Sequence, residues 1–320
     1  MKNSSSPVHL DPNQPAEEAV RSILVELGTS LRRSVDLTVN NSGPDPLHDL
    51  RVATRRTRSA LSQLGAVLPA EEVATFAADF TWLGEITGPC RDLDVWLLDL
   101  SARRDDLATD KATALSQFES EVRAARDRAH AEVVLGITSP RCRRLLESWE
   151  AFLSNQSATA EPPQDADTPL KVFADERITK AYQRVLRRGR DLGAESPPEA
   201  LHRLRIAAKK LRYLLEFFRS LYRAESIDPR ITELKGLQDV LGELNDREIQ
   251  RERLTVMTRD LEATVGADTL AAMSDLGSDL DHRQRELRHT FRNHFDPIVS
   301  AAAQLEYRAL FDVNASRYSP

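Results

Sequence analysis

Two histidines, each followed by a run of arginines and lysines, are the residues of this sequence whose types and spacing point most directly to chemistry. His48 begins the segment HDLRVATRRTR, and His202 begins HRLRIAAKKLR 154 residues later. Guanidinium groups stay charged at cellular pH and donate two parallel hydrogen bonds to phosphate oxygens. Imidazole adds a shorter donor whose positive charge is favoured beside an anion. Both segments are therefore predicted to contact a phosphate-rich anion.

A helix places the cations of each segment on one face, at about 100° per residue. The first face comprises His48, Arg51, Arg55 and Arg58, flanked by Arg56; the second comprises His202, Arg205, Lys209 and Arg212, flanked by Lys210. The opposite faces carry apolar stripes, Leu50, Ala53, Thr57, Leu61 and Leu64 in the first segment and Leu204, Ala207, Leu211, Leu215 and Phe218 in the second. Like charges at this spacing repel one another, so each basic face favours an anionic ligand. A solvated surface helix is the alternative, but it needs no histidine at the same point twice.

The spacing of 154 residues continues beyond the two basic segments. The sequence GPCRD at 88–92 falls in register with GELND at 242–246. A chain of 320 residues is long enough for about two domains of ordinary size. We therefore expect a tandem duplication whose two halves present similar faces to one ligand.

Helical periodicity dominates the chain, which contains only 12 glycines. We expect an all-α protein with these principal helices: 16–40, 46–67, 71–87 and 92–153 (interrupted near 136–140), then 169–191, 198–222, 228–241 and 245–295 (interrupted near Gly266 or Gly277). Asp45-Pro46 and the capping-box spacing from Ser196 to Glu199 indicate the starts of the two basic helices. Residues 1–14 are expected to form a flexible tail and 154–168 a polar linker between repeats 15–153 and 169–305. Long helices joined by short turns are typical of antiparallel bundles.

A second basic stripe lies on the helix expected at the start of the second half. It comprises Arg177, Lys180, Arg184, Arg187 and Arg188. In the first half Arg33 matches Arg187, but Ser30 stands where Arg184 would be. The two halves are therefore expected to bind unequally.

The two histidine segments, each followed by Leu-Arg-aliphatic-Ala and further cations and then by Asp92 or Asp246, resemble the CHAD family, named for its conserved histidine α-helical domain. The resemblance covers about residues 15–305. It implies two pseudo-symmetric four-helix bundles around a central basic cavity that binds inorganic polyphosphate. Because the basic helices lack carboxylates that could hold Mg²⁺ or orient water, we expect binding without catalysis. Residue by residue, it assigns polyanion contact to His48, Arg51, Arg55, Arg56 and Arg58, and to His202, Arg205, Lys209, Lys210 and Arg212. With the second stripe, the expected contacts also include Arg33, Lys180, Arg184, Arg187 and Arg188.

Asp92 and Asp246 match the family pattern, but the sequence gives them no clear chemistry. We expect each to cap the following helix or to orient an arginine, rather than to catalyse a reaction. Asn245 stands where the first half has Arg91. A contact made by Arg91 is therefore not expected to be duplicated.

Composition bounds the class of protein. The chain is 41% hydrophobic and 29% charged, and no apolar run reaches the roughly 18 residues of a membrane span. Two cysteines form no disulfide framework or metal-ligand spacing, and the first residues lack the apolar region of a signal peptide. We expect a cytoplasmic protein that could associate with polyphosphate granules. The net charge of −6 does not exclude a polyanion ligand, because the local clustering of the 44 lysines and arginines decides binding.

Two other function classes stay open at this stage. A nucleic-acid backbone binder is the first, since any basic groove attracts phosphodiesters, although aromatic residues for base stacking are scarce. A phosphoanhydride hydrolase is less favoured, because no Gly-rich phosphate loop appears and ESEVR at 119–123 only approximates the motif of triphosphate-cleaving tunnel domains. His282, Glu286 and His289 share a helical face, but the arginines around them disfavour a metal. No cofactor is expected.

Overall fold

The computed structural model describes residues 9–40, 43–105, 109–154, 163 and 165–312, and these residues fold almost entirely into helices. The first half contains α1 (Ala16–Asn40), α2 (Pro44–Leu64), η1 (Gly65–Val67), α3 (Ala70–Asp105), α4 (Thr109–Ile137) and α5 (Pro140–Ser154). The second contains α6 (Leu170–Gly189), α7 (Pro198–Phe217), η2 (Arg219–Leu221), α8 (Ala224–Leu261), α9 (Ala267–Val299) and α10 (Ala301–Leu310). The predicted all-α class is confirmed.

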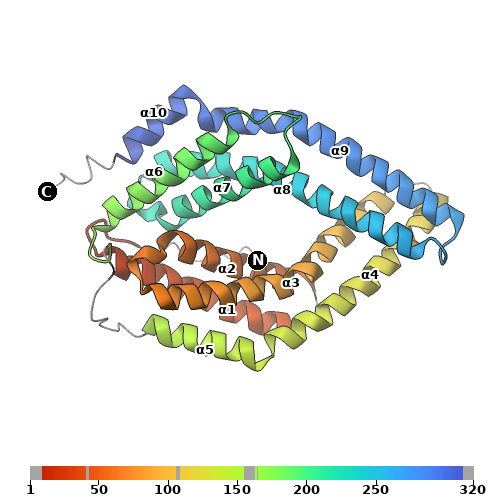
Figure 1. The fold of residues 1–320 in the computed structure, drawn as a ribbon, viewed down its shortest axis with the longest axis horizontal. Helices are drawn as coiled ribbons and strands as arrows, with labels where there is room; N and C mark the ends of the chain where they lie inside the picture. The colour runs from red at the N-terminus through yellow and green to blue at the C-terminus, as the bar shows by residue number, and fades with distance from the viewer. Residues whose placement is uncertain (1–8, 41–42, 106–108, 155–162, 164, 313–320) are drawn as a thin grey trace.

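The helices of the two halves lie on opposite sides of the molecule (Figure 1). Within the first half α1 packs on α2, α2 on α3 and α3 on α4, and the corresponding helices α6 to α9 pack in the same order. The main contacts between the halves are those of α4 with α9 and of α2 with α7, and α1 also contacts α6. The helices α3 and α8 lie between these contacts (Figure 1).

Two separate apolar cores hold the arrangement. The larger core contains buried side chains of both halves, including those of α2 and α7. The smaller core joins the far ends of α3 and α4 to α8 and α9, with Trp96 edge-on to Phe118 at 5.4 Å and Met273 buried beside them. Buried apolar area is the main driving force for such contacts. The helix pairs α3–α4 and α8–α9 are therefore held by apolar contacts at both ends.

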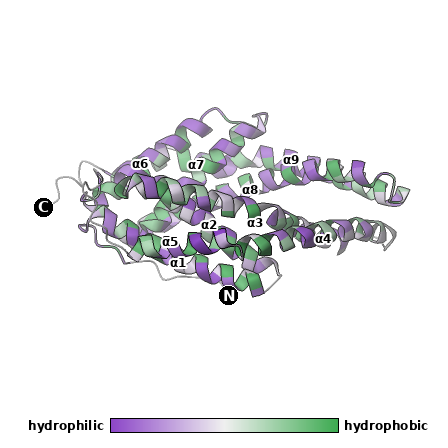
Figure 2. Cartoon of the chain, turned by 60° about the horizontal axis from the view of Figure 1, so that its bottom comes forward, coloured by the Kyte–Doolittle hydropathy of each residue, from purple (hydrophilic) through white to green (hydrophobic). Residues whose placement is uncertain are grey.

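The predicted apolar stripes of the two basic helices are buried as expected. Leu50 and Leu64 of α2 are fully buried, as are Leu204 and Leu211 of α7. Figure 2 shows hydrophilic and hydrophobic residues alternating along the helices, as amphipathic helices require. The cations on the opposite sides of α2 and α7 are thereby held away from the core.

Two expected helix boundaries are wrong. α3 continues through Pro89, and α8 continues from Ala224 to Leu261 through Gly242, so neither half has a turn before its aspartate. Burial on both sides of the expected break, by Leu83 and Leu93 in α3, outweighs the one backbone hydrogen bond that Pro89 removes. The interruption expected near Gly266 is correct, whereas Gly277 lies inside α9.

The caps of the basic helices also differ from the prediction. α2 has Gly43 as N-cap with Pro44 in the first turn, two residues before the expected Asp45-Pro46. α7 has Pro197 as N-cap. The Ser196 hydroxyl accepts a hydrogen bond from the Gly193 amide at 2.9 Å instead of completing a capping box.

Part of the expected tail is packed against the body. Leu10 is only 2% exposed, and its amide donates to the Ser220 hydroxyl at 3.3 Å. Pro15 and Pro169 form an isolated antiparallel bridge, which fixes the end of the expected linker. Most of the linker, 155–162 and 164, and residues 1–8 of the tail lie outside the described residues. Among the helices that the structure describes, none combines the length and apolarity that crossing a membrane requires.

Candidate anion-binding cavity

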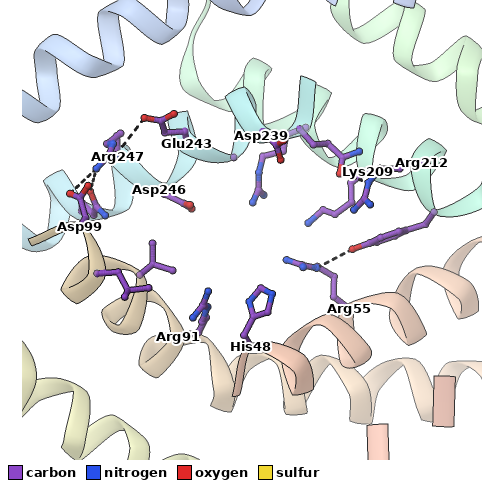
Figure 3. A pocket seen from close by; sticks show the side chains of 17 residues that line it. His48, Arg55, Arg91, Asp99, Lys209, Arg212, Asp239, Glu243, Asp246 and Arg247 are labelled. Atoms are coloured by element: carbon purple, nitrogen blue, oxygen red, sulfur yellow. Dashed lines mark hydrogen bonds and ion pairs between the residues drawn. The ribbon is translucent and has the colours of Figure 1, made fainter. Parts of the chain in front are cut away.

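A cavity of about 720 Å³ lies between the two halves, bounded by α2, α3, α7 and α8. Its cationic lining comprises His48, Arg55, Arg91, Arg205, Lys209, Arg212 and Arg247. Figure 3 shows His48, Arg55 and Arg91 reaching into the space from one side and Lys209 and Arg212 from the opposite side. The cavity therefore brings together cations that lie about 150 residues apart in the sequence.

Lys209 lies at the centre of the positive charge. Its pKa is lowered to about 7, first by burial and then by four surrounding arginines. These four, with Lys209, are named here the cation cluster: Arg51 and Arg55 of α2, and Arg205 and Arg212 of α7. Burial and nearby positive charges both disfavour the protonated ammonium group, and an anion placed among these cations would favour it. The cation cluster is therefore a strong site for an anion.

Two further lining groups feel the same environment. Burial, followed by the charges of Arg91 and Arg55, lowers the pKa of His48 below its ordinary value. Burial also lowers the pKa of Arg205, although the Asp246 carboxylate partly opposes this effect. An anion entering the cavity would raise the pKa of each group and hold it charged.

Four carboxylates also line the cavity, Asp99, Asp239, Glu243 and Asp246, and two of them have arginine partners. Asp99 accepts from Arg247 at 2.8 Å and from Arg103 at 3.1 Å. Glu243 accepts from Arg283 at 2.8 Å and from Arg247 at 3.4 Å. Figure 3 shows the pairs of Arg247 with Asp99 and Glu243 on the side of the cavity away from Lys209. Of the cations that α2 and α7 supply, Arg212 is paired with Glu216, whereas Arg55, Arg205 and Lys209 form no ion pair with the described residues.

Some predicted contact residues of α2 do not line the cavity. Arg51 turns onto α3, where it donates to the Gly84 carbonyl at 3.0 Å and to the Thr87 hydroxyl at 3.2 Å. Arg58 also lies against Gly84, whose missing side chain leaves room for it. Arg56 forms an ion pair with Glu216 of α7 at 2.9 Å.

The second histidine lies outside the cavity lining as well. His202 borders a smaller pocket of about 290 Å³ between α7, α8 and α9, where its Nδ1 lies 3.1 Å from the Asn245 amide oxygen. Lys210 faces the other flank of α7 and donates to the Ser62 hydroxyl at 3.0 Å. The two histidine segments therefore supply the cavity with different residues.

The second basic stripe on α6 is also separate from the cavity. Arg177 forms an ion pair with Asp165 at 3.2 Å, and Lys180 forms one with Glu176 at 3.4 Å. Arg184, Arg187 and Arg188 are exposed on the outer side of α6. Arg33, their expected match in the first half, borders a groove between α1 and α5.

The two aspartates lie in the middle of helices, so they cannot cap a following helix. Asp92 accepts from Arg253 of the other half at 3.0 Å. Burial raises the pKa of Asp246, which the nearby Arg205 opposes, and the charge of Asp92 raises it further. The alternative role, a carboxylate that orients an arginine, agrees with these neighbours.

Several lining residues were not among the predicted contacts. Arg91 faces the cavity beside His48, and its position one residue before the duplicated Asp92 was the available signal. Val95, Leu98 and Gln238 also line the cavity, but nothing in the helical pattern distinguishes them from ordinary surface residues.

Of the possible metal ligands His282, Glu286 and His289, the first two interact with each other. His282 lies 3.3 Å from Glu286, which also accepts from Arg283 at 3.2 Å. Within the described residues, no three histidine, cysteine or acidic side chains gather as a metal site.

Comparison with known proteins places this architecture. The chain is 27% identical over 296 residues, 91% of its length, to the uncharacterized proteins Rv2226 and MT2285 of two Mycobacterium tuberculosis strains. It spans about half the length of these curated relatives, 55%.

Two solved structures share the fold. The crystal structure of the CHAD domain from the plant Ricinus communis has a TM-score of 0.75 at 24% identity, covering 91% of this chain and 95% of that one. PptA from Streptomyces chartreusis has a TM-score of 0.67 at 17% identity, covering 88% and 99%. The family model for the CHAD domain matches residues 23–255. This protein therefore belongs to the CHAD domain family.

Proposed function

We propose that the protein binds inorganic polyphosphate, without turnover, in the cavity between its two halves. The observation that carries the proposal is the cation cluster, in which Lys209 is surrounded by arginines of both basic helices. Guanidinium and ammonium groups held at this density match a ligand with a negative charge on every repeating unit. Membership of the CHAD family, whose domains are associated with polyphosphate binding, supports the same ligand.

We further propose that the two halves are pseudo-symmetric bundles. A contact at the α2–α7 junction recurs after the 154-residue shift: Arg56 pairs with Glu216, and Lys210 donates to Ser62. Under the shift, Arg56 corresponds to Lys210 and Ser62 corresponds to Glu216. A contact repeated with its partners exchanged is the mark of an internal two-fold relation. A ligand on this axis would contact both halves.

The paired carboxylates restrict where the polymer would lie. Asp99 and Glu243 would repel phosphate if they were free, but their arginine partners compensate them. The polymer is therefore expected along α2 and α7, at Arg55, Arg205, Lys209 and Arg212. His48 and Arg91 provide further donors on the side of α2 and α3.

Nucleic acid is the second candidate, and one observation weakens it. Tyr213, the aromatic residue of the cavity lining, is 2% exposed, and its hydroxyl accepts from Arg55 at 3.1 Å. A ring held in this way offers no free face for stacking a base. The site favours a polyanion without bases.

We propose that the protein is cytoplasmic and that it associates with polyphosphate, including polyphosphate granules. We also propose that it is not an enzyme, since Asp92 interacts with Arg253 and the Asp246 carboxyl with Arg205. Carboxylates engaged in this way are poorly placed to hold Mg²⁺ or to orient an attacking water.

A competition experiment tests the function. Labelled long-chain polyphosphate would be displaced by unlabelled long-chain polyphosphate, pyrophosphate or single-stranded RNA at one ionic strength. We expect long chains to displace the label at a far lower phosphate concentration than pyrophosphate, because only a polymer spans cations of both halves. If RNA displaced the label equally well per phosphate, the protein would be a general binder of phosphate backbones and not a binder specific for polyphosphate. Equally effective pyrophosphate would contradict a cavity shared by both halves.

A further inference from the structure

Four cations on the outer side of the second half form a basic strip that the cavity does not include. This outer strip consists of Arg184 and Arg188 of α6 and Arg203 and Lys210 of α7. The Arg188 guanidinium donates to the Arg203 carbonyl at 3.0 Å, which places the two helices side by side here. The pKa of Lys210 is lowered by burial and then by the charges of Arg184 and Arg188.

The outer strip carries positive charge without acidic partners. Arg184, Arg188 and Arg203 are exposed, and in the part of the chain that the structure describes none of the four forms an ion pair. Neither 177–190 of α6 nor 200–215 of α7 contains an acidic residue. Some other exposed arginines are paired, such as Arg219 with Asp228 and Arg283 with Glu243. Others, such as Arg143 and Arg144 of α5, are exposed on a single helix, whereas the outer strip brings four cations of two helices together.

The first half has no equivalent of the outer strip. At the positions of Arg184, Arg188 and Arg203 it carries Ser30, Ser34 and Asp49. Only Lys210 has a cationic counterpart, Arg56, which is neutralised by Glu216. The cations of the two basic helices that line the cavity, Arg55, Arg205, Lys209 and Arg212, have cationic counterparts in the other half, whereas the outer strip is cationic mainly in one half.

The solvent-facing side of α7 connects the outer strip to the cavity. At 100° per residue, Lys209 and Arg205 face the cavity, His202 comes next around the helix, and Lys210 and Arg203 follow. His202 is exposed and borders the neighbouring pocket together with Arg203. Between 200 and 215 α7 contains no carboxylate, although Ile206 lies between His202 and Lys210 and the pocket beside His202 also includes Glu199 and Glu248.

We propose that the outer strip is a second contact site for polyphosphate, which binds the part of a long chain that leaves the cavity around α7. The proposal rests on the proposed function of the cavity. A chain short enough to fit inside the cavity does not reach the outer strip, so this site makes affinity depend on chain length. Because the first half lacks the outer strip, the chain leaves the cavity preferentially on one side.

The test replaces two arginines by the residues of the first half. Arg184→Ser with Arg188→Ser removes two exposed charges at helix positions where serine costs little stability. The matched control is Arg143→Ser with Arg144→Ser, which removes two exposed charges from α5. Arg205→Ala with Lys209→Ala disables the cavity. Each protein would be titrated with long-chain polyphosphate, tripolyphosphate and single-stranded RNA at several salt concentrations.

We expect Arg184→Ser with Arg188→Ser to weaken binding of long-chain polyphosphate by about tenfold or more and to leave tripolyphosphate within about twofold. The dependence of log affinity on log salt concentration should fall by about one to two, since two fewer phosphates release counterions. The cavity variant should weaken binding of both ligands, and the α5 control should match the wild type.

Different failures separate the outer strip from the cavity. Unchanged long-chain affinity in the strip variant, an equal loss for tripolyphosphate, or an equal loss in the α5 control would each overturn the outer strip while leaving the cavity in place. A strip variant that loses RNA binding alone would overturn it in favour of nucleic acid. A wild-type protein that binds neither polyphosphate would overturn both proposals.

Discussion

The two basic helices began as similar sequences, but their arginines are used differently. On the first half, glycine at position 84 of α3 exposes its carbonyl, so Arg51 donates to it and Arg58 lies against it. On the second half, Gln238 occupies the matching position and holds Arg212 at the cavity through a hydrogen bond of 2.9 Å. Glu216, which has Ser62 as its counterpart in the first half, also pairs with Arg212. The side chains next to each arginine therefore differ between the halves.

This difference predicts that the second half contributes more to binding. Arg205→Ala with Lys209→Ala should weaken polyphosphate binding by roughly 100-fold or more, because each charged hydrogen bond contributes about 1.5–3 kcal/mol. Arg51→Ala with Arg56→Ala should weaken it by about tenfold or less, since both arginines are occupied by protein groups. Isothermal titration would compare the two pairs. Equal losses would mean that the two halves bind alike.

The pH dependence of binding sharpens the same comparison. The pKa of Lys209 is about 7, whereas α2 carries Arg55, which stays charged, and His48, whose pKa is lowered below its ordinary value of 6.5, at the cavity. Affinity should fall by up to about tenfold for each pH unit between 7 and 9, because binding must return a proton to Lys209. Lys209→Arg should remove most of this dependence. A wild-type affinity that is flat over this range would contradict the position given to Lys209.

The stability of the unliganded protein should change in the opposite direction. Lys209 has a lower pKa in the folded protein than in the unfolded chain, where it is near 10.5. Between these two values the unfolded chain binds more protons, so the free energy of unfolding rises with pH. Urea denaturation at pH 7 and pH 9 would show the gain, and Lys209→Arg would reduce it.

A smaller effect separates Arg51 from Arg205. Arg51→Met removes two hydrogen bonds to α3 and should lower the free energy of unfolding by about 1–3 kcal/mol. Arg205→Met should leave stability unchanged or raise it, because Arg205 adds to the repulsion within the cation cluster. Thermal unfolding of both variants gives the comparison. Equal melting temperatures would agree with the prediction from the sequence that both arginines lie opposite the apolar stripe and are not structural.

The smallest expected effect concerns the two aspartates. Incubation with polyphosphate and Mg²⁺ should release no orthophosphate above a protein-free control, and Asp92→Asn and Asp246→Asn should change nothing in this assay. Turnover that either substitution abolishes would move these carboxylates into catalysis. Asp92→Asn should still weaken the contact with Arg253 and thereby destabilise the junction of the halves slightly.

The helical pattern predicted the helices better than their ends. The apolar stripes of α2 and α7 were identified correctly because burial repeats with the helical period. The turns before Asp92 and Asp246 were wrong because Gly88-Pro89 and Gly242 are local signals, and packing of α3 and α8 on both sides overrides them. A helical wheel also placed Arg51 toward the ligand, since it contains no information about the adjacent helix.

The sequence by itself determined that this is an all-helical protein with two similar basic helices, because periodicity and charge spacing are local properties of the chain. Only the tertiary structure decided which cations meet, since the distance between Arg55 and Lys209 depends on how α2 packs on α7. It also placed His202 and Lys210 outside the cavity that His48 lines. Electrostatic interactions fall off with distance and are screened by solvent, so the pairing of helices, rather than the number of arginines, creates the binding site.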